Sequence, residues 1–237
     1  MPPSRRVDRR ALQAALLAIA VAVGASLPAA SAAKTVHTPY YVSSADVDLT
    51  TLLAPPPDPD SPLERYDEKK IAEILVSRTN ADLARAAADA HRSVFVFADV
   101  LGPGFNAQRV PLTAALFDRL DSDTELLVDQ AKAYFARPRP PGAKKTHASY
   151  PSGHAAFAAC AAILLSQMVP EKRDVLFGRA SLFAQSRLVA GVHYPSDVQA
   201  GWISGTLVAA ALMQKPEFRS DFAAAKAETR GALGLQR

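Results

Sequence analysis

Two long apolar segments constrain the fold of this chain more than any other feature. They run from Ala155 to Val169 and from Val198 to Met213, and they contain 15 and 16 residues. A helix that crosses a membrane needs about 20 consecutive apolar residues, so both segments are too short for that role. Gly201 and Gly205, in the second segment, fit close packing inside a bundle as well as helix pairing in a membrane. We therefore expect both segments to form central helices of a folded domain.

The other sequence patterns also indicate helices. The chain has 237 residues, enough for one domain with a sizeable core. Apolar residues recur at helical spacing, and no segment alternates apolar and polar residues over the length of a strand. The predicted fold class is all-α, a compact helical bundle. The expected helices, besides the two apolar ones, cover Glu68–Leu75, Asn80 toward Phe97, Leu112–Leu120, Ser122–Ala131 and Pro170–Leu188.

The N-terminal segment has the three-part pattern of a secretory signal peptide. Basic residues between Arg5 and Arg10 precede an apolar run, and Ala30-x-Ala32 offers a cleavage site. We predict a signal peptide at 1–32, an extended Pro-rich arm at 33–62 and a helical domain at 63–237. The mature protein is then expected in the periplasm or outside the cell. A retained membrane anchor and a twin-arginine export route both stay open.

The charge of the chain argues against nucleic acid as a partner. The formal net charge is +4, but residues 1–32 hold four arginines and one aspartate. Without them Lys+Arg falls from 27 to 23 and Asp+Glu from 23 to 22, which leaves +1. No long basic stripe remains. No stable membrane insertion is expected after leader removal, a homo-oligomer stays open, and the single cysteine, Cys160, is expected to be a buried thiol.

Three short motifs carry the residues of a candidate site. The second of them, Pro151-Ser152-Gly153-His154, directly precedes an apolar helix. Ser152 can cap that helix, whose first amides are then free to bind an anion. Gly153 has no side chain, so an oxyanion can approach the backbone. His154 would stand at the edge of the bound anion.

The first motif, Lys132-x6-Arg139-Pro140, supplies two cations for the same anion. Lys132 and Arg139 are seven residues apart and would share a helix face if the helix continued that far. Arg137 lies five residues from Lys132, on a different face, so we prefer Arg139 as the ligand. The segment that follows is expected to be an exposed loop outside the site; it contains Lys144, Lys145 and His147.

The third motif, Ser186-Arg187-x5-His193-x3-Asp197, supplies a third cation and a nucleophile. Asp197 follows His193 by four residues and can hold one imidazole nitrogen through its N–H. The other nitrogen is then free to attack.

Together the three motifs resemble the signature of the type 2 phosphatidic-acid-phosphatase superfamily, which also includes the vanadium haloperoxidases. The segment Ser149–His154 is similar to that of bacterial class A non-specific acid phosphatases, and so is Leu101–Phe105. The resemblance covers about residues 90–215 and implies a helical bundle that needs no metal or other cofactor. Ten residues separate Pro140 from Pro151, a short connection for this class that leaves substrate preference open.

The resemblance also implies a role for each candidate residue. By similarity, His193 attacks phosphorus and becomes a phosphohistidine, and Asp197 orients it. His154 protonates the leaving oxygen and later activates water. The implied phosphate ligands are Lys132, Arg139, Ser152, Gly153 and Arg187.

The predicted function is therefore that of an exported acid phosphatase that hydrolyses phosphate monoesters with broad specificity. One alternative is a vanadate-dependent haloperoxidase, against which the modest length and the sequence around His154 argue. A lipid phosphate phosphatase is a second, opposed by the missing membrane spans. A phosphate-binding module without turnover is a third. Binding alone would need only the cations, so His154, His193 and Asp197 argue against it.

Overall fold

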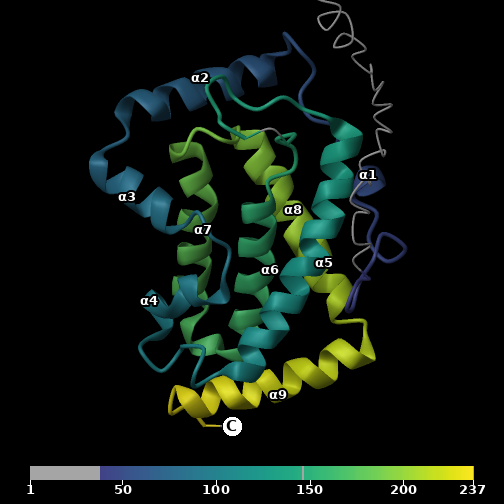
Figure 1. Cartoon of the computed structure of the whole chain (residues 1–237), viewed down its shortest axis with the longest axis vertical. Coiled ribbons are helices and arrows are strands. Elements are labelled where there is room, and N and C mark those ends of the chain that lie inside the picture. The colour runs from purple at the N-terminus through teal and green to yellow at the C-terminus, as the bar shows by residue number, and fades with distance from the viewer. Residues whose placement is uncertain (1–37, 146, 237) are drawn as a thin grey trace, which may run out of the picture. The chain divides into compact units, whose positions relative to one another are not determined.

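The computed structural model describes residues 38–145 and 147–236. All regular elements in these ranges are helices, which confirms the all-α prediction. Four long helices form the bundle, α9 crosses one end of it, and α2 and α3 cover the other end and flank α7 (Figure 1). The elements are α1 (Leu49–Leu52), α2 (Pro62–Ser77), α3 (Asn80–Ala88), η1 (Val94–Phe97), α4 (Ala98–Leu101), α5 (Pro111–Phe135), α6 (Gly153–Met168), η2 (Pro170–Lys172), α7 (Arg173–Val189), α8 (Pro195–Leu212) and α9 (Pro216–Ala232).

The order of the helices brings the three motifs to one end of the bundle. Helices α5 and α7 end there, and α6 and α8 begin there (Figure 1). The first motif spans the end of α5, the second the start of α6, and the third the connection from α7 to α8. The alternating direction of successive helices is therefore what places residues 132–197 around one site.

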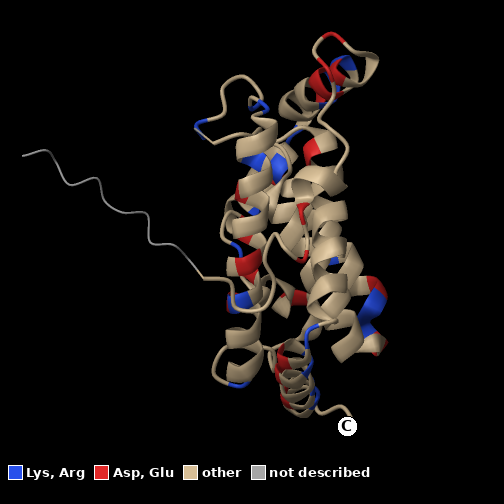
Figure 2. Ribbon diagram, turned by 90° about the vertical axis from the view of Figure 1, so that its right-hand side faces the viewer, with Lys and Arg blue, Asp and Glu red and all other residues tan. Residues whose placement is uncertain are grey.

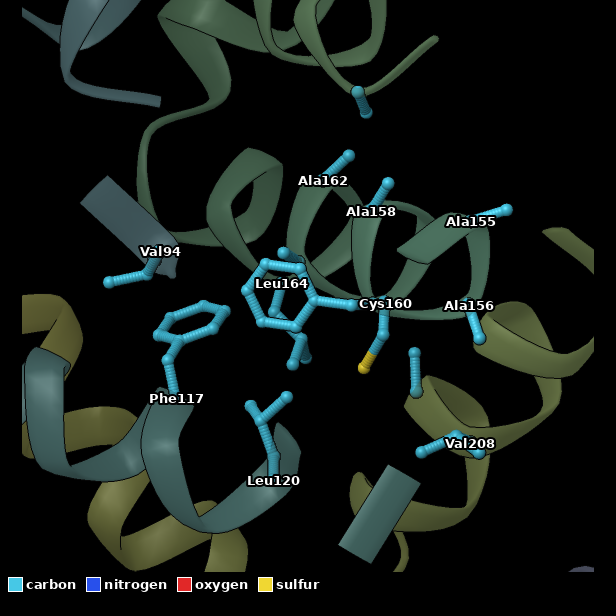
Figure 3. Close-up of a cluster of buried hydrophobic side chains, with 14 of the residues drawn as sticks. Val94, Phe117, Leu120, Ala155, Ala156, Ala158, Cys160, Ala162, Leu164 and Val208 are labelled. Carbon is cyan, nitrogen blue, oxygen red and sulfur yellow. The ribbon is translucent and has the colours of Figure 1, made fainter. Parts of the chain in front are cut away.

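Helix α6 is the centre of the core, as its apolar sequence predicts. Cys160 is fully buried on α6, as expected, and burial raises the pKa of its thiol. Figure 3 shows Phe117 and Leu120 of α5 and Val208 of α8 gathered around this part of α6. Six of the sixteen α6 residues are alanine, so the neighbouring helices can approach it closely.

Helices α6 and α8 pack at unusually short range through two glycines. A Cβ atom on Gly201 would lie 2.5 Å from the carbonyl oxygen of Ser152, and one on Gly205 would lie 2.1 Å from that of Ala156. Close packing in the bundle is thus the correct explanation of the Gly201-x3-Gly205 pattern. The contact between α6 and α8 also links the second motif to the third, because the Ser152 N–H donates to the Asp197 carbonyl at 2.9 Å.

The helix break predicted near Ser122 is wrong. The segment forms one 25-residue helix, α5. The Ser122 hydroxyl donates to the Asp118 carbonyl one turn earlier, at 3.1 Å, and does not cap a new helix. The Asp123 carboxylate instead accepts the backbone N–H groups of residues 40–42 at 2.7–3.1 Å. Asp123 therefore tethers the N-terminal segment to the bundle.

The helix predicted from Asn80 toward Phe97 is also shorter than expected. The helix begins at Asn80, as predicted, and Thr79 is its N-cap, in a capping box with Asp82. The helix ends at Ala88, and the carboxylate of its C-cap residue, Asp89, pairs with Arg179 at 2.6 Å. Residues 89–93 consequently form a loop that connects α3 to η1.

The described part of the N-terminal arm, residues 38–61, is extended except for α1 and lies along α5 (Figure 1). The predicted signal peptide, 1–32, lies outside the described residues. Within 38–145 and 147–236, no helix has the length and apolar character that crossing a bilayer requires. In the view of Figure 2, Lys and Arg are interspersed with Asp and Glu along the helices.

Candidate active site

Residues from all three motifs line a single cavity of about 220 Å³ at the motif end of the bundle. Six of the eight residues singled out from the sequence are on its wall. They are Lys132, Arg139, Gly153, His154, Arg187 and His193. The other two, Ser152 and Asp197, are fully buried directly behind that wall.

The start of α6 forms one side of the cavity. The Ser152 hydroxyl accepts the Ala155 N–H at a long 3.4 Å, so it caps the helix as expected. Gly153 lines the cavity, and a Cβ atom on it would lie 3.4 Å from Nη1 of Arg92 and 3.8 Å from Nζ of Lys132. The positive end of the helix dipole and two side-chain cations thus face the same space.

His154 is held in one tautomer by a backbone carbonyl. Its Nε2 lies 3.0 Å from the Ala90 oxygen, which can only accept, so Nε2 carries the hydrogen. The ring stacks on Phe183, with centroids 5.5 Å apart. Burial, helped by the nearby Arg187 charge, lowers the pKa of His154 to about 2. His154 is therefore neutral, with Nδ1 available for a proton.

His193 is buried between an acid and a cation. Its Nε2 lies 3.2 Å from Nη1 of Arg139, a group that can only donate, so Nε2 is the unprotonated nitrogen. Its Nδ1 lies 3.4 Å from Oδ2 of Asp197, longer than a normal hydrogen bond, and the contact is mainly electrostatic. Burial lowers the pKa of His193 although Asp197 opposes that shift. His193 is thus a neutral imidazole with an Nε2 lone pair at the cavity.

Asp197 is fixed by partners on both of its oxygens. Oδ2, which faces His193, also accepts the Tyr194 N–H at 2.8 Å, and Oδ1 binds Nη1 of Arg137 at 2.7 Å. Burial alone would raise the pKa of Asp197, but His193 and Arg137 outweigh burial and lower it. The carboxylate is therefore ionised and held in one orientation.

Arg137 lies behind the site and not in it. Its Nη2 binds Glu64 and Asp67 of α2, and its guanidinium stacks over the Tyr194 ring at 4.3 Å. Arg139, by contrast, is on the cavity wall. The sequence-based preference for Arg139 agrees with this geometry, although the helix ends at Phe135 and no shared helix face is involved.

Two of the motif cations keep their charge available to the cavity. Arg139 donates to the carbonyls of His147 and Ala148 at 2.7 and 3.1 Å, and Arg187 donates to that of Ala86 at 2.6 Å. Within the described ranges, neither guanidinium has a carboxylate within ion-pair distance. Lys132 pairs with Asp129 at 3.1 Å. The three cations suit the binding of an anion. Among the described residues, no group of three or more His, Cys, Asp and Glu side chains could hold a metal ion.

The cavity has basic residues that the sequence analysis missed. Lys145 and His147 are in an exposed loop, as expected, but both also line the cavity, which their sequence context does not indicate. Arg92 reaches the wall from the loop after α3. None of these residues belongs to a motif, and only the fold reveals their position.

Comparisons with known proteins agree with the motifs. The model of the PAP2 superfamily matches residues 112–221. The non-specific acid phosphatase of Salmonella typhimurium is 32% identical, over 84% of this chain and 86% of that protein. That of Providencia stuartii is 28% identical, over 89% and 92%.

A likeness to a solved structure supports the fold. A transmembrane PAP2-type phosphatidylglycerolphosphate phosphatase from Bacillus subtilis superposes with a TM-score of 0.50 at 21% identity. The superposition covers 70% of this chain and 89% of that one.

Proposed function

Because the chain belongs to the PAP2 superfamily, among the bacterial non-specific acid phosphatases, we propose that it hydrolyses a broad range of phosphate monoesters through a phosphohistidine. The observation that carries this proposal is the placement of two differently held imidazoles, His154 and His193, on the wall of one cationic cavity. A protein that only bound phosphate would need the cations but neither imidazole.

The phosphoryl group would be held by charge on several sides. Lys132, Arg139 and Arg187 would neutralise its oxygens, and the free Gly153 amide would donate to one of them. Ser152 is also proposed as a ligand. Its hydroxyl has only the weak 3.4 Å cap bond to give up, although it must rotate toward the cavity to take part.

His193 would act as the nucleophile through Nε2. In the structure, Nη1 of Arg139 donates to the Nε2 lone pair of His193. When Nη1 donates to a bound phosphate oxygen instead, the Nε2 lone pair becomes free to attack. The lone pair forms an N–P bond while the ester P–O bond breaks. His193 becomes positively charged on attack, and Asp197 stabilises that charge from the Nδ1 side.

His154 would transfer the proton in both half-reactions. Because its Nε2–H is bound to the Ala90 carbonyl, the proton must be carried on Nδ1. Protonated His154 gives this proton to the departing ester oxygen, and an alcohol leaves. Water then attacks phosphorus and returns a proton to His154; the N–P bond breaks and its electron pair goes back to His193.

The working pH should be mildly acidic. The first half-reaction needs His154 protonated while His193 is neutral. The pKa of His154 is lowered to about 2, by burial first and then by Arg187. A bound phosphate places negative charge beside the ring and so raises this pKa toward the working range.

We also propose that the chain acts outside the cytoplasm. The support is the signal-peptide pattern of residues 1–32, with cleavage after Ala32. Intact-mass measurement of the exported protein tests this. A mature N-terminus at Ala33 is expected, and a full-length membrane-bound chain would contradict it.

The activity is tested with p-nitrophenyl phosphate and a panel of nucleotides, sugar phosphates, phytate and pyrophosphate. We expect the wild-type protein to hydrolyse several of these monoesters, and the His193→Ala and His154→Ala variants to lose most activity. Near-wild-type turnover by either variant would contradict the mechanism. Chelation should leave activity intact, because side-chain cations supply the charge; a strong loss in EDTA would favour a metal phosphatase.

A further inference from the structure

Arg92 brings an additional guanidinium to the cavity from outside the three motifs. It belongs to the loop between α3 and η1, and its side chain is only 18% exposed. It lines the same cavity as Gly153 and His154. Its position is therefore a consequence of the fold and of the early end of α3.

Two carboxylates of α5 hold one edge of the Arg92 guanidinium. Nε lies 2.9 and 3.0 Å from the two oxygens of Asp121, and Nη2 lies 2.9 Å from Oε1 of Glu125. Nη1 is left over, and no residue in 38–145 or 147–236 forms a hydrogen bond or ion pair with it. Asp121 and Glu125 thus fix the plane of the Arg92 guanidinium, while its Nη1 amino group stays free.

The free Nη1 faces the start of α6. A Cβ atom built on Gly153 would lie 3.4 Å from Nη1 of Arg92 and 3.8 Å from Nζ of Lys132. The two cations therefore flank the space directly in front of Gly153. An oxygen of a phosphoryl group bound at the helix start would come within reach of both.

We propose that Nη1 of Arg92 is a phosphate ligand, donating a hydrogen bond to the bound phosphoryl group beside the Gly153 amide. This inference rests on the proposed function and adds a fourth cation to Lys132, Arg139 and Arg187. Asp121 and Glu125 contact only Nε and Nη2, so Nη1 remains a hydrogen-bond donor, and the charge of Glu125, which is 54% exposed, is screened by water.

The alternative role for Arg92 is purely structural, as an ion pair that ties its loop to α5. The two roles predict different outcomes. Loss of a structural ion pair lowers the melting temperature and leaves phosphate affinity unchanged. Loss of a ligand weakens phosphate binding in a protein that is still folded.

The test compares Arg92→Met and Arg92→Lys with wild type. Binding of inorganic phosphate is measured by calorimetry, and its inhibition of p-nitrophenyl phosphate hydrolysis by kinetics. Loss of a charge-assisted hydrogen bond should raise the phosphate Kd about 10-fold or more in Arg92→Met. The phosphate Kd of Arg92→Lys should lie between those of wild type and Arg92→Met, because a lysine ammonium cannot be held by Asp121 and Glu125 in the way that the guanidinium is.

Arg230→Met is the matched control. Arg230 is 12% exposed and pairs with Glu171 at 2.9 Å, but it belongs to α9 and does not line the cavity. Its loss should cost stability and leave the phosphate Kd at the wild-type value. Equal phosphate affinities for Arg92→Met, Arg230→Met and wild type would overturn the proposal.

Two further outcomes are decisive. If Arg92→Met does not fold, Arg92→Lys decides, and an unchanged phosphate Kd in that variant would refute the role of Arg92. If the wild-type protein binds phosphate without hydrolysing esters, the proposed function fails. The comparison of phosphate Kd values would still decide the role of Arg92.

Discussion

Nη1 of Arg137 lies 2.7 Å from Oδ1 of Asp197, and the two side chains are 4% and 0% exposed. The other oxygen of this carboxylate faces His193. The carboxylate that faces the proposed nucleophile is therefore itself held by a buried guanidinium. Arg137 reaches Asp67 on α2 as well, so the covering helix is tied to the same network.

Removal of Arg137 should reduce both stability and turnover. Arg137→Met leaves Asp67 and Asp197 buried without their partner, which should cost about 3–5 kcal/mol of unfolding free energy. Arg137→Lys keeps the charge but cannot bind both carboxylates through a fork. A misplaced His193 should then lower kcat about 10- to 100-fold. KM should change little, because Arg137 does not line the cavity.

Denaturant unfolding and steady-state kinetics check this prediction, with Arg230→Lys as the control. Arg230 also pairs with a carboxylate, the half-exposed Glu171, but it belongs to α9 and does not line the cavity, so its replacement should leave kcat unchanged. A rise in KM at constant kcat in Arg137→Lys would instead make Arg137 a substrate ligand.

Gly205→Ala should destabilise the protein and damage the site. The new methyl group would lie 2.1 Å from the Ala156 oxygen, so α6 and α8 must separate. Overpacking of this kind costs about 1–3 kcal/mol or more. Separation would also stretch the 2.9 Å hydrogen bond from the Ser152 N–H to the Asp197 carbonyl.

Gly178→Ala is the matched control for that substitution. Gly178 lies within α7, and a Cβ there would meet nothing within 4 Å. It should stabilise the protein by about 0.5–1 kcal/mol through helix propensity alone. Urea unfolding of both variants checks whether the unfolding free energy falls in Gly205→Ala and rises in Gly178→Ala. An unchanged unfolding free energy in Gly205→Ala would contradict the close approach of α6 and α8.

Gly153→Ala should separate binding from folding. A Cβ at this position meets its neighbours at 3.4–3.8 Å, which is ordinary contact, so the melting temperature should stay near wild type. The methyl group would nevertheless occupy the space between Arg92 and Lys132. We expect phosphate affinity to fall about 10-fold. Unchanged phosphate binding by calorimetry would place the anion elsewhere.

The ligand-free protein should lose stability as the pH falls below about 6.5. The pKa of His154 is lowered to about 2 from 6.5 in the folded state, so below pH 6.5 the unfolded chain binds a proton that the folded chain does not. His193 shifts in the same direction. The stability that the neutral histidines contribute is fully present above their pKa in the unfolded chain. It is lost as the pH falls toward their pKa in the folded protein.

Melting curves between about pH 7 and pH 5 check this dependence. Bound phosphate should reduce the loss, because its negative charge favours protonated His154. His154→Gln should flatten the pH dependence. A slope that is the same in wild type and in His154→Gln, with and without phosphate, would contradict the buried neutral imidazole.

The sequence predicts those parts of the site that depend on local structure. The Ser152 cap and the His193–Asp197 spacing can be recognised because each is decided within one helical turn. The continuity of α5 through Ser122 cannot be recognised from the sequence. Asp123 does not cap a helix but accepts the backbone N–H groups of residues 40–42, which are distant in the chain. The roles of Arg92 and Arg137 depend on α5, α2 and α8 partners far away in the chain, and only the fold brings them together.

The most direct test of the account is to trap the phosphorylated enzyme. The mature protein would be mixed with p-nitrophenyl phosphate, quenched within milliseconds under alkaline conditions and digested for mass spectrometry. We predict one phosphoryl group, labile to acid and stable to alkali, on the peptide that contains His193, and none in His193→Gln. Turnover by wild type with no phosphorylated peptide, or with the label on another residue, would contradict the phosphohistidine mechanism.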